Sequence, residues 1–232
     1  MKALFHGGLL TAAIAGASCS GGGSPSTVPP TTPATPAPSL SYAWTASFAP
    51  GTQTGQIAFP PWTGNWPNAQ LATATVTLTA TPTSSVQLIT TAQCATVKQT
   101  SSTAFVVTQG NSGVCFLVAT STAAAIAIPV SAGFPPYDVL FLQVAGQPAT
   151  SNAIALSRST YSATVSAYDY REPLGPERGA EFTASSYGGC ASVAPASSTS
   201  VPSTFQITRT AAAPCFVIIS DTVYESQIVT LQ

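Results

Sequence analysis

Apolar and polar side chains alternate along much of the chain from about residue 40 onward. The clearest case is Ala72–Ala80, in which alanine, valine and leucine take every second position and threonines take the positions between them. A period of two places successive side chains on opposite faces of a β-strand. One face then belongs to a core, and the other is a threonine surface that is hydrated without charge. No stretch has the spacing of an amphipathic helix, so the pattern predicts an all-β chain.

Other short apolar segments follow, and proline, glycine and serine separate them. We expect strands at 42–48, around Val86, Phe105, Cys115 and Ile126, and then at 139–144, 154–157, 161–168, 181–185, around Val193, and at 205–208, 215–220 and 227–231. Short strands at this spacing are typical of a β-sandwich and not of a parallel α/β sheet.

One cysteine-bearing segment occurs twice. Val86–Val97 aligns without a gap with Phe182–Val193, and Phe105–Thr120 aligns with Phe205–Ser220. The four cysteines of the repeat allow three pairings. The repeat favours the two pairings within each copy, because each unit then closes on itself. We therefore expect the disulfides Cys94–Cys115 and Cys190–Cys215, one in each of two domains at 40–130 and 137–232, with a short joint at 131–136.

The first 18 residues have the features of an export signal. Lys2 supplies the positive charge, and the apolar stretch from Leu9 to Ala17 is too short to span a bilayer as a helix. Ala15-Gly16-Ala17 has the small-x-small pattern of ordinary signal peptidase, which would cut before Ser18. Residues 19–39 then form a Gly/Pro/Thr/Ser linker that we expect to be disordered and extended.

A second interpretation of the same segment involves a lipid. Gly16-Ala17-Ser18-Cys19 resembles the lipobox of bacterial lipoproteins, although Gly16 stands where a Leu-like residue is usual. The resemblance implies cleavage before Cys19 and attachment of a diacylglycerol to its sulfur. We favour lipidation because Cys19 is the one cysteine without a partner in the repeat and a flexible tether begins directly after it.

The charge content limits the partners. Charged residues are 6% of the chain, apolar residues are 45%, and the formal net charge is −1, whereas about a quarter of the residues in ordinary soluble domains are charged. Lys98 is the only lysine or arginine between Cys19 and Pro136. Nucleic acid requires a basic surface that displaces its counterions, so the sequence argues against a nucleic-acid partner.

The sequence also argues against an enzyme. The only histidine is His6 in the signal segment, which removes Ser-His and Cys-His nucleophiles and histidine zinc ligands from the mature chain. The first domain contains no Asp or Glu, and the four repeat cysteines lack the close pairs of a zinc site. We expect no catalytic residue, no metal and no cofactor.

Two segments are candidates for binding. Trp62 and Trp66 lie in a Pro/Gly loop and could form an aromatic platform for a glycan or peptide, although capping of the sandwich end is the simpler role. The insert at 168–181 is the one charged cluster, and a solvated loop with ion pairs is its simpler role. If the protein has a polar binding site, we expect it in this insert, with Tyr168, Asp169, Tyr170, Arg171 and Glu172 as the candidate residues.

The second domain carries the resemblance to a family. Its segments 189–197, 204–208 and 214–221 resemble the bacterial immunoglobulin-like (Big-type) repeats of surface proteins. The resemblance implies two tandem immunoglobulin-like β-sandwiches, a role as stalk, spacer or adhesive module, and no shared catalytic residues.

The expected protein is an exported, lipid-anchored module of the bacterial envelope that acts as a display stalk or spacer. The alternative function is a carbohydrate- or protein-binding module at the cell surface, and the alternative location is a secreted protein. Its expected contacts are the membrane, through the N-terminal lipid, and a possible protein or glycan partner.

Overall fold

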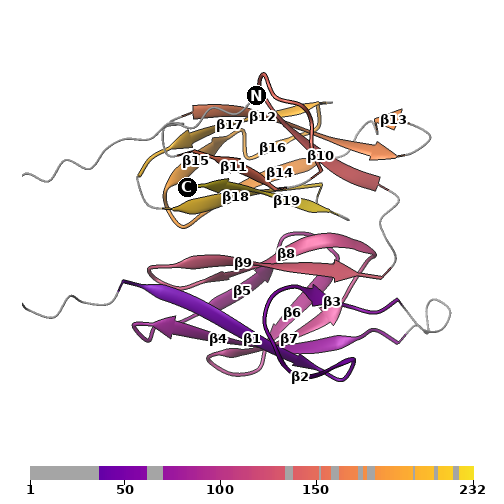
Figure 1. Cartoon of the computed structure of the whole chain (residues 1–232), viewed down its shortest axis with the longest axis vertical. Coiled ribbons are helices and arrows are strands. Elements are labelled where there is room, and N and C mark those ends of the chain that lie inside the picture. The colour runs from indigo at the N-terminus through magenta and orange to yellow at the C-terminus, as the bar shows by residue number, and fades with distance from the viewer. Residues whose placement is uncertain are drawn as a thin grey trace, which may run out of the picture. The chain divides into compact units, whose positions relative to one another are not determined.

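The computed structural model of the chain describes residues 37–61, 70–133, 138–151, 153–157, 162–171, 175–176, 181–200, 202–211, 214–221 and 225–232 (Figure 1). Regular structure within these ranges is entirely β, as the alternating pattern predicts. None of the described residues forms a helix that could cross a membrane.

The first sandwich is built from two sheets whose strands are mostly antiparallel. Sheet 1A has the strand order β2-β1-β4-β7-β6, with the bounds β1 Ser39–Ala46, β2 Ala49–Gln53, β4 Thr73–Thr81, β6 Ala95–Gln99 and β7 Ala104–Gln109. Sheet 1B has the order β3-β9-β8-β5, with the bounds β3 Ile57–Ala58, β5 Gln87–Thr90, β8 Gly113–Thr120 and β9 Ala125–Ala132. β9 therefore includes the first two residues of the expected joint.

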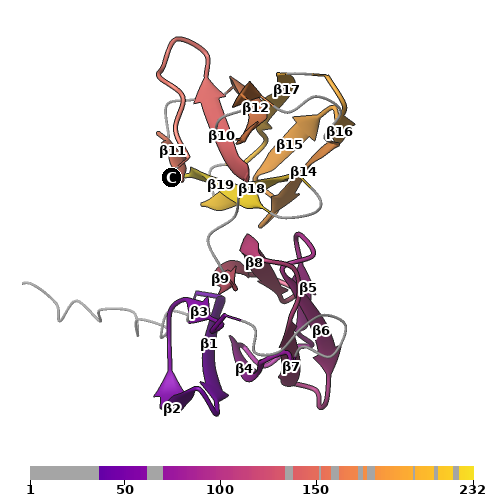
Figure 2. The ribbon, with the colours of Figure 1, turned by 90° about the vertical axis from the view of Figure 1, so that its right-hand side faces the viewer.

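The second sandwich has the same plan. Sheet 2A has the order β10-β12-β17-β15, and β13 pairs with β12; the bounds are β10 Asp138–Val144, β12 Ser162–Arg171, β13 Gly175–Pro176, β15 Ala191–Ala194 and β17 Ser203–Arg209. Sheet 2B has the order β11-β19-β18-β14-β16; the bounds are β11 Ile154–Leu156, β14 Phe182–Tyr187, β16 Ser197–Ser198, β18 Cys215–Ser220 and β19 Ser226–Leu231. Figure 2 shows the strands of each sandwich from the side.

The sequence repeat is a repeat of topology and register. Val97 of β6 lies opposite Val107 of β7, and the aligned residues Val193 and Ile207 lie opposite each other in β15 and β17. The short strands β3 and β11 each run parallel to the corresponding strands β9 and β19. The copies differ in the segment that connects these strands: residues 100–103 connect β6 to β7, and the longer segment 195–202 connects β15 to β17. The longer segment of the second copy contains β16, which pairs with β14.

Each core is formed by the apolar residues that alternate along the strands. In β4 the alternation is complete, because Ala74, Val76 and Leu78 are buried while the threonines between them are exposed. The first core also contains Trp44, Phe105, Leu117 and Ile128, and the second core contains Leu142, Val165, Phe182, Phe205 and Val217. The fold is therefore that of two tandem immunoglobulin-like β-sandwiches, which confirms the expected fold class.

The structure departs from the expected elements at a few places. β2, β3, β6, β13 and β16 are strands that the pattern did not predict. Residues 168–171, expected to open a charged insert, continue β12 as far as Arg171 and pair with β10. The expected loop was wrong for residues 169–171, because the backbone partners in β10 extend the ladder through them, whereas Tyr168 was also expected as the last residue of a strand.

Candidate functional site

The two disulfides join the sheets of each sandwich. Cys94 directly precedes β6 of sheet 1A, and its partner Cys115 lies in β8 of sheet 1B. In the second copy, Cys190 precedes β15 and its partner Cys215 lies in β18. All four cysteines are buried. The pairings are those that the repeat predicts, and each one closes its sandwich across the core.

An apolar contact joins the outer faces of sheets 1B and 2B. Val118 of β8, which is 0% exposed, packs with Phe216 and Ile218 of β18. Phe116, Ala125, Ala127, Tyr187 and Ile228 surround these three residues. All six residues of β18 are buried, because its inner face meets the core of the second sandwich and its outer face meets β8 and β9.

Tyr187 borders this contact and stacks on Phe216, with ring centroids 5.6 Å apart. Burial raises the pKa of the Tyr187 phenol, and a hydrogen bond with Ser185 lowers it by less. The phenol is therefore neutral at physiological pH, so this contact is maintained without a charge on Tyr187.

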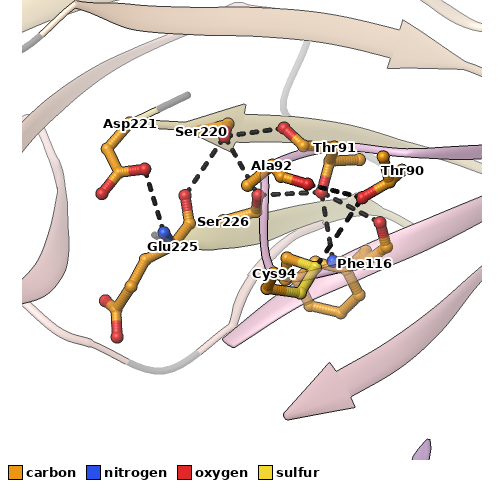
Figure 3. The surroundings of a disulfide bond; sticks show 10 residues. Thr90, Thr91, Ala92, Cys94, Phe116, Ser220, Asp221, Glu225 and Ser226 are labelled. Atoms are coloured by element: carbon orange, nitrogen blue, oxygen red, sulfur yellow. Dashed lines mark hydrogen bonds between the residues drawn. A yellow bond between two sulfur atoms is a disulfide. The ribbon is translucent and has the colours of Figure 1, made fainter. Parts of the chain in front are cut away.

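A cluster of hydroxyl groups lies beside the apolar contact (Figure 3). Thr91 Oγ1 and Ser226 Oγ share a hydrogen bond of 2.8 Å, and Ser220 Oγ donates to the Thr91 carbonyl oxygen at 2.8 Å. Ser226 Oγ also donates to Ser220 Oγ at 3.1 Å. These bonds link the segment after β5 to the end of β18 and the start of β19, so these polar groups at the edge of the contact are paired.

Two buried carboxylates lie next to the ends of β18 and β19. Asp221 is 5% exposed and accepts a bond from the Glu225 backbone N–H at 2.9 Å. Glu225 is 4% exposed and accepts a bond from the Leu140 backbone N–H in β10. Sequence reasoning missed both residues. Their bonds to main-chain donors and their burial indicate a structural role at the ends of these two strands.

The buried Gln109 performs a similar role in the first sandwich. It is 1% exposed, its Nε2 donates to the Pro60 carbonyl oxygen at 2.9 Å, and its Oε1 accepts from the Ala72 N–H at 3.2 Å. One side chain thereby fixes the chain on both sides of residues 62–69. Gln109 interrupts the apolar alternation of Phe105 and Val107 on the inner face of β7, and this is the sequence signal that could have identified it.

Replacing Gln109 by leucine tests this role. We expect Gln109→Leu to lower the free energy of unfolding by about 2 kcal/mol, because the Pro60 carbonyl and the Ala72 N–H lose their partner at a part-buried position. Urea unfolding followed by tryptophan fluorescence measures the change. Gln99→Leu on the exposed end of neighbouring β6 is the control, with an expected change under about 0.5 kcal/mol. Equal stability of the two variants would contradict the role.

The outer face of sheet 1A carries uncharged hydroxyl groups along β4, and Lys98 is exposed on β6 opposite Val106. On β4 all five threonines are exposed: Thr73, Thr75, Thr77, Thr79 and Thr81. A shallow hollow of about 430 Å³ lies over β1, β2 and β4, and it is lined by Thr45, Ala46, Ser47, Gly51, Thr52, Thr73 and Thr75. Its lining contains no charged residue.

A second hollow, of about 620 Å³, lies where the start of β6 and the end of β7 meet the end of β5 in sheet 1B and the segment that follows it. It is lined by Leu71, Thr90, Thr91, Ala92, Gln93, Ala95, Thr96, Thr108, Gln109, Gly110 and Asn111. This lining is also uncharged. The two hollows meet where Thr73 of the first lies directly opposite Thr108 of the second, which in turn lies opposite Thr96.

The structure describes only some of the candidate binding and lipidation residues that the sequence suggested. Cys19, Trp62, Trp66 and Glu172 lie outside the described residues. For residues 168–171 the structure gives the strand and its pairing with β10. The two hollows were not predicted, since they combine residues from six strands and from the segments that connect them.

The fold and its contacts place the chain in the class of tandem immunoglobulin-like β-sandwich proteins. No family model matches the sequence, and no curated protein matches it. Similar solved structures include domains 5–6 of the S-layer protein SbsC, at 17% identity and a TM-score of 0.28, with 84% of this chain and 98% of that chain covered.

Two further solved structures resemble the chain to a similar degree. The Yersinia pseudotuberculosis adhesin InvE is 12% identical with a TM-score of 0.28, covering 84% of this chain and 58% of that chain. The endo-fucoidan hydrolase MfFcnA9 is 11% identical with a TM-score of 0.29, covering 83% of this chain and 34% of that chain. A surface-layer protein, an adhesin and a hydrolase differ in function, and at these scores the likeness carries no argument about the function of this chain.

Proposed function

We propose that this chain is a non-enzymatic module of the bacterial envelope, held to a membrane by a lipid on Cys19, and that it acts as a rigid spacer or display stalk. The observation that carries the proposal is the apolar contact between sheets 1B and 2B. Val118, Phe216 and Ile218 are at most 8% exposed there. Tandem domains that share a covered apolar face move as one body, whereas tandem domains joined only by a linker reorient freely.

The disulfides support the same role. Each bridge ties the two sheets of its sandwich and limits the unfolded chain. Bridges of this kind persist in oxidising compartments, outside the cytosol. An exported spacer that meets proteases and changing solvent conditions benefits from both effects.

The surface supports a passive role as well. The first sandwich has Lys98 as its only charged residue, and the threonine face of β4 is hydrated without charge. In the second sandwich the buried Asp221 and Glu225 accept bonds from main-chain N–H groups, so these carboxylates serve the fold.

Detergent partitioning of the full chain, expressed in a bacterial host, tests the anchor. We expect the native chain to enter the detergent phase and Cys19→Ala to remain in the aqueous phase. Mass spectrometry of the native N-terminus should find a diacylated Cys19, and a digest without reduction should contain the Cys94–Cys115 and Cys190–Cys215 peptides. An unmodified N-terminus at Ser18, or the same partitioning for both proteins, would contradict the anchored role.

A further inference from the structure

The two hollows are neighbours across the strands, and together they are called the track here. The first hollow covers β2, β1 and β4, and the second covers the edge formed by β7 and β6. They join at the directly opposed residues Thr73 and Thr108. With a strand spacing of about 4.8 Å, the five strands of the sheet give the track a length of about 19 Å.

The walls of the second hollow are fixed before any ligand arrives. The Gly110 N–H donates to the Cys94 carbonyl at 2.8 Å, and the Asn111 N–H donates to the Gln93 carbonyl at 2.8 Å. A Cβ at Gly110 would lie 2.1 Å from the Gln93 carbonyl oxygen, so this close approach requires glycine. The adjacent disulfide at Cys94 holds the same loop. A preformed wall reduces the entropy lost on binding.

The chemistry of the lining selects the class of ligand. Hydroxyl and amide groups, which donate and accept hydrogen bonds, line both hollows, and charged side chains line neither. The Asn111 side-chain amide bonds to the Gln93 side chain at 3.2 Å, which orients both groups at the rim. Leu71, 40% exposed, adds one apolar surface at the end of the track.

A protein partner fits this surface less well. Protein interfaces bury aromatic or large apolar anchors at their centre, and the centre of this track is the pair Thr73 and Thr108. No charged side chain lines either hollow, and the nearest charge on this face is Lys98, two residues from Thr96 on β6. A neutral polyhydroxyl chain matches both the hydrogen-bonding groups and the extended form of the track.

We propose that the outer face of sheet 1A binds a linear neutral polysaccharide, which lies across the strands from the β1–β2 hairpin to the loop at Gln93. The site is distinct from the Trp62/Trp66 segment and from the insert at 168–181. It does not depend on the lipid anchor, and its second hollow reaches Thr90 of sheet 1B and Thr91, which also bonds to Ser226 of the second sandwich.

Affinity electrophoresis in native gels tests the site. The probes are three neutral polysaccharides, namely hydroxyethyl cellulose, mixed-linkage β-glucan and mannan, and alginate as the charged comparison. We expect at least one neutral polymer to retard the native chain. Thr73→Val with Thr108→Val keeps the shape of both side chains and removes two hydroxyls from the centre of the track. It should weaken binding about 30-fold, since the two lost hydrogen bonds contribute about 1 kcal/mol each.

The matched control is Thr79→Val with Thr81→Val, on the same strand and the same exposed face but outside both hollows. We expect it to bind as the native chain does, and both variants to keep the native thermal midpoint. The proposal is overturned if no neutral polymer retards the native chain, if alginate alone does so, or if the control loses as much affinity as the variant at the centre of the track.

Discussion

Removal of the bridge between Cys94 and Cys115 is expected to lower the free energy of unfolding of the first sandwich by about 3 kcal/mol. The bridge closes a loop with a sequence separation of 21, and in the chain-entropy model a loop of this size gives a stabilisation of about 3 kcal/mol. Both cysteines are 0% exposed, so the double variant Cys94→Ala with Cys115→Ala also loses packed sulfur atoms from the core.

Tryptophan fluorescence during urea unfolding isolates this effect. The three tryptophans of the chain, Trp44, Trp62 and Trp66, all precede the second sandwich, so their signal reports on the first. The matched control is Cys190→Ala with Cys215→Ala, which opens the corresponding bridge of the second copy. We expect the control to shift the fluorescence transition much less. Equal shifts for both variants, or a shift under about 1 kcal/mol for the first, would contradict a local effect of the bridge.

Strands in which apolar and polar side chains alternate could be predicted from the sequence. Strands that form only because their backbone pairs with a neighbouring strand could not. Thr73–Thr81 has one apolar and one threonine face, and the sequence located it within a residue. Ala49–Gln53 contains Pro50 and Gly51, which argue against a strand, and it is tolerated because β2 is the edge of its sheet. β3 and β16, two residues each, exist only through their partners in β9 and β14.

The repeat contained more information than the alternation alone. A strand was expected around Val193, and the aligned Val97 lies in the corresponding strand β6, which was missed. The disulfides followed from the repeat because each copy carries its own pair of cysteines. The sequence also contains a signal for the contact between the two sandwiches. Cys215–Ile219 is an unbroken apolar run, which is typical of a strand that is covered on both faces.

The hollows on sheet 1A had no such signal. They depend on the register that sets Thr73 opposite Thr108 and Thr108 opposite Thr96, and register between strands far apart in sequence cannot be derived from their alternation. The roles of Gln109, Asp221 and Glu225 likewise depend on backbone groups that only the folded chain brings near them.

The contact between the sandwiches should fail when a charge is placed at its centre. Val118 is 0% exposed between β8 and β18, so Val118→Lys loses the packing of an apolar side chain and buries an unpaired ammonium group. We expect a cost of about 3 kcal/mol to the packed arrangement. Because Val118 points away from the core of its own sandwich, both sandwiches should remain folded, with their disulfides intact.

Calorimetry and small-angle scattering together measure this separation. The native chain should unfold in one cooperative transition, and Val118→Lys should unfold in two, with a larger radius of gyration before unfolding. Val106→Lys is the matched control, since Val106 is a half-buried valine on the outer face of sheet 1A, away from the contact. An unchanged radius with a single transition in Val118→Lys would show that the sandwiches do not depend on this contact. The rigid-spacer role would then lose the apolar contact on which it rests.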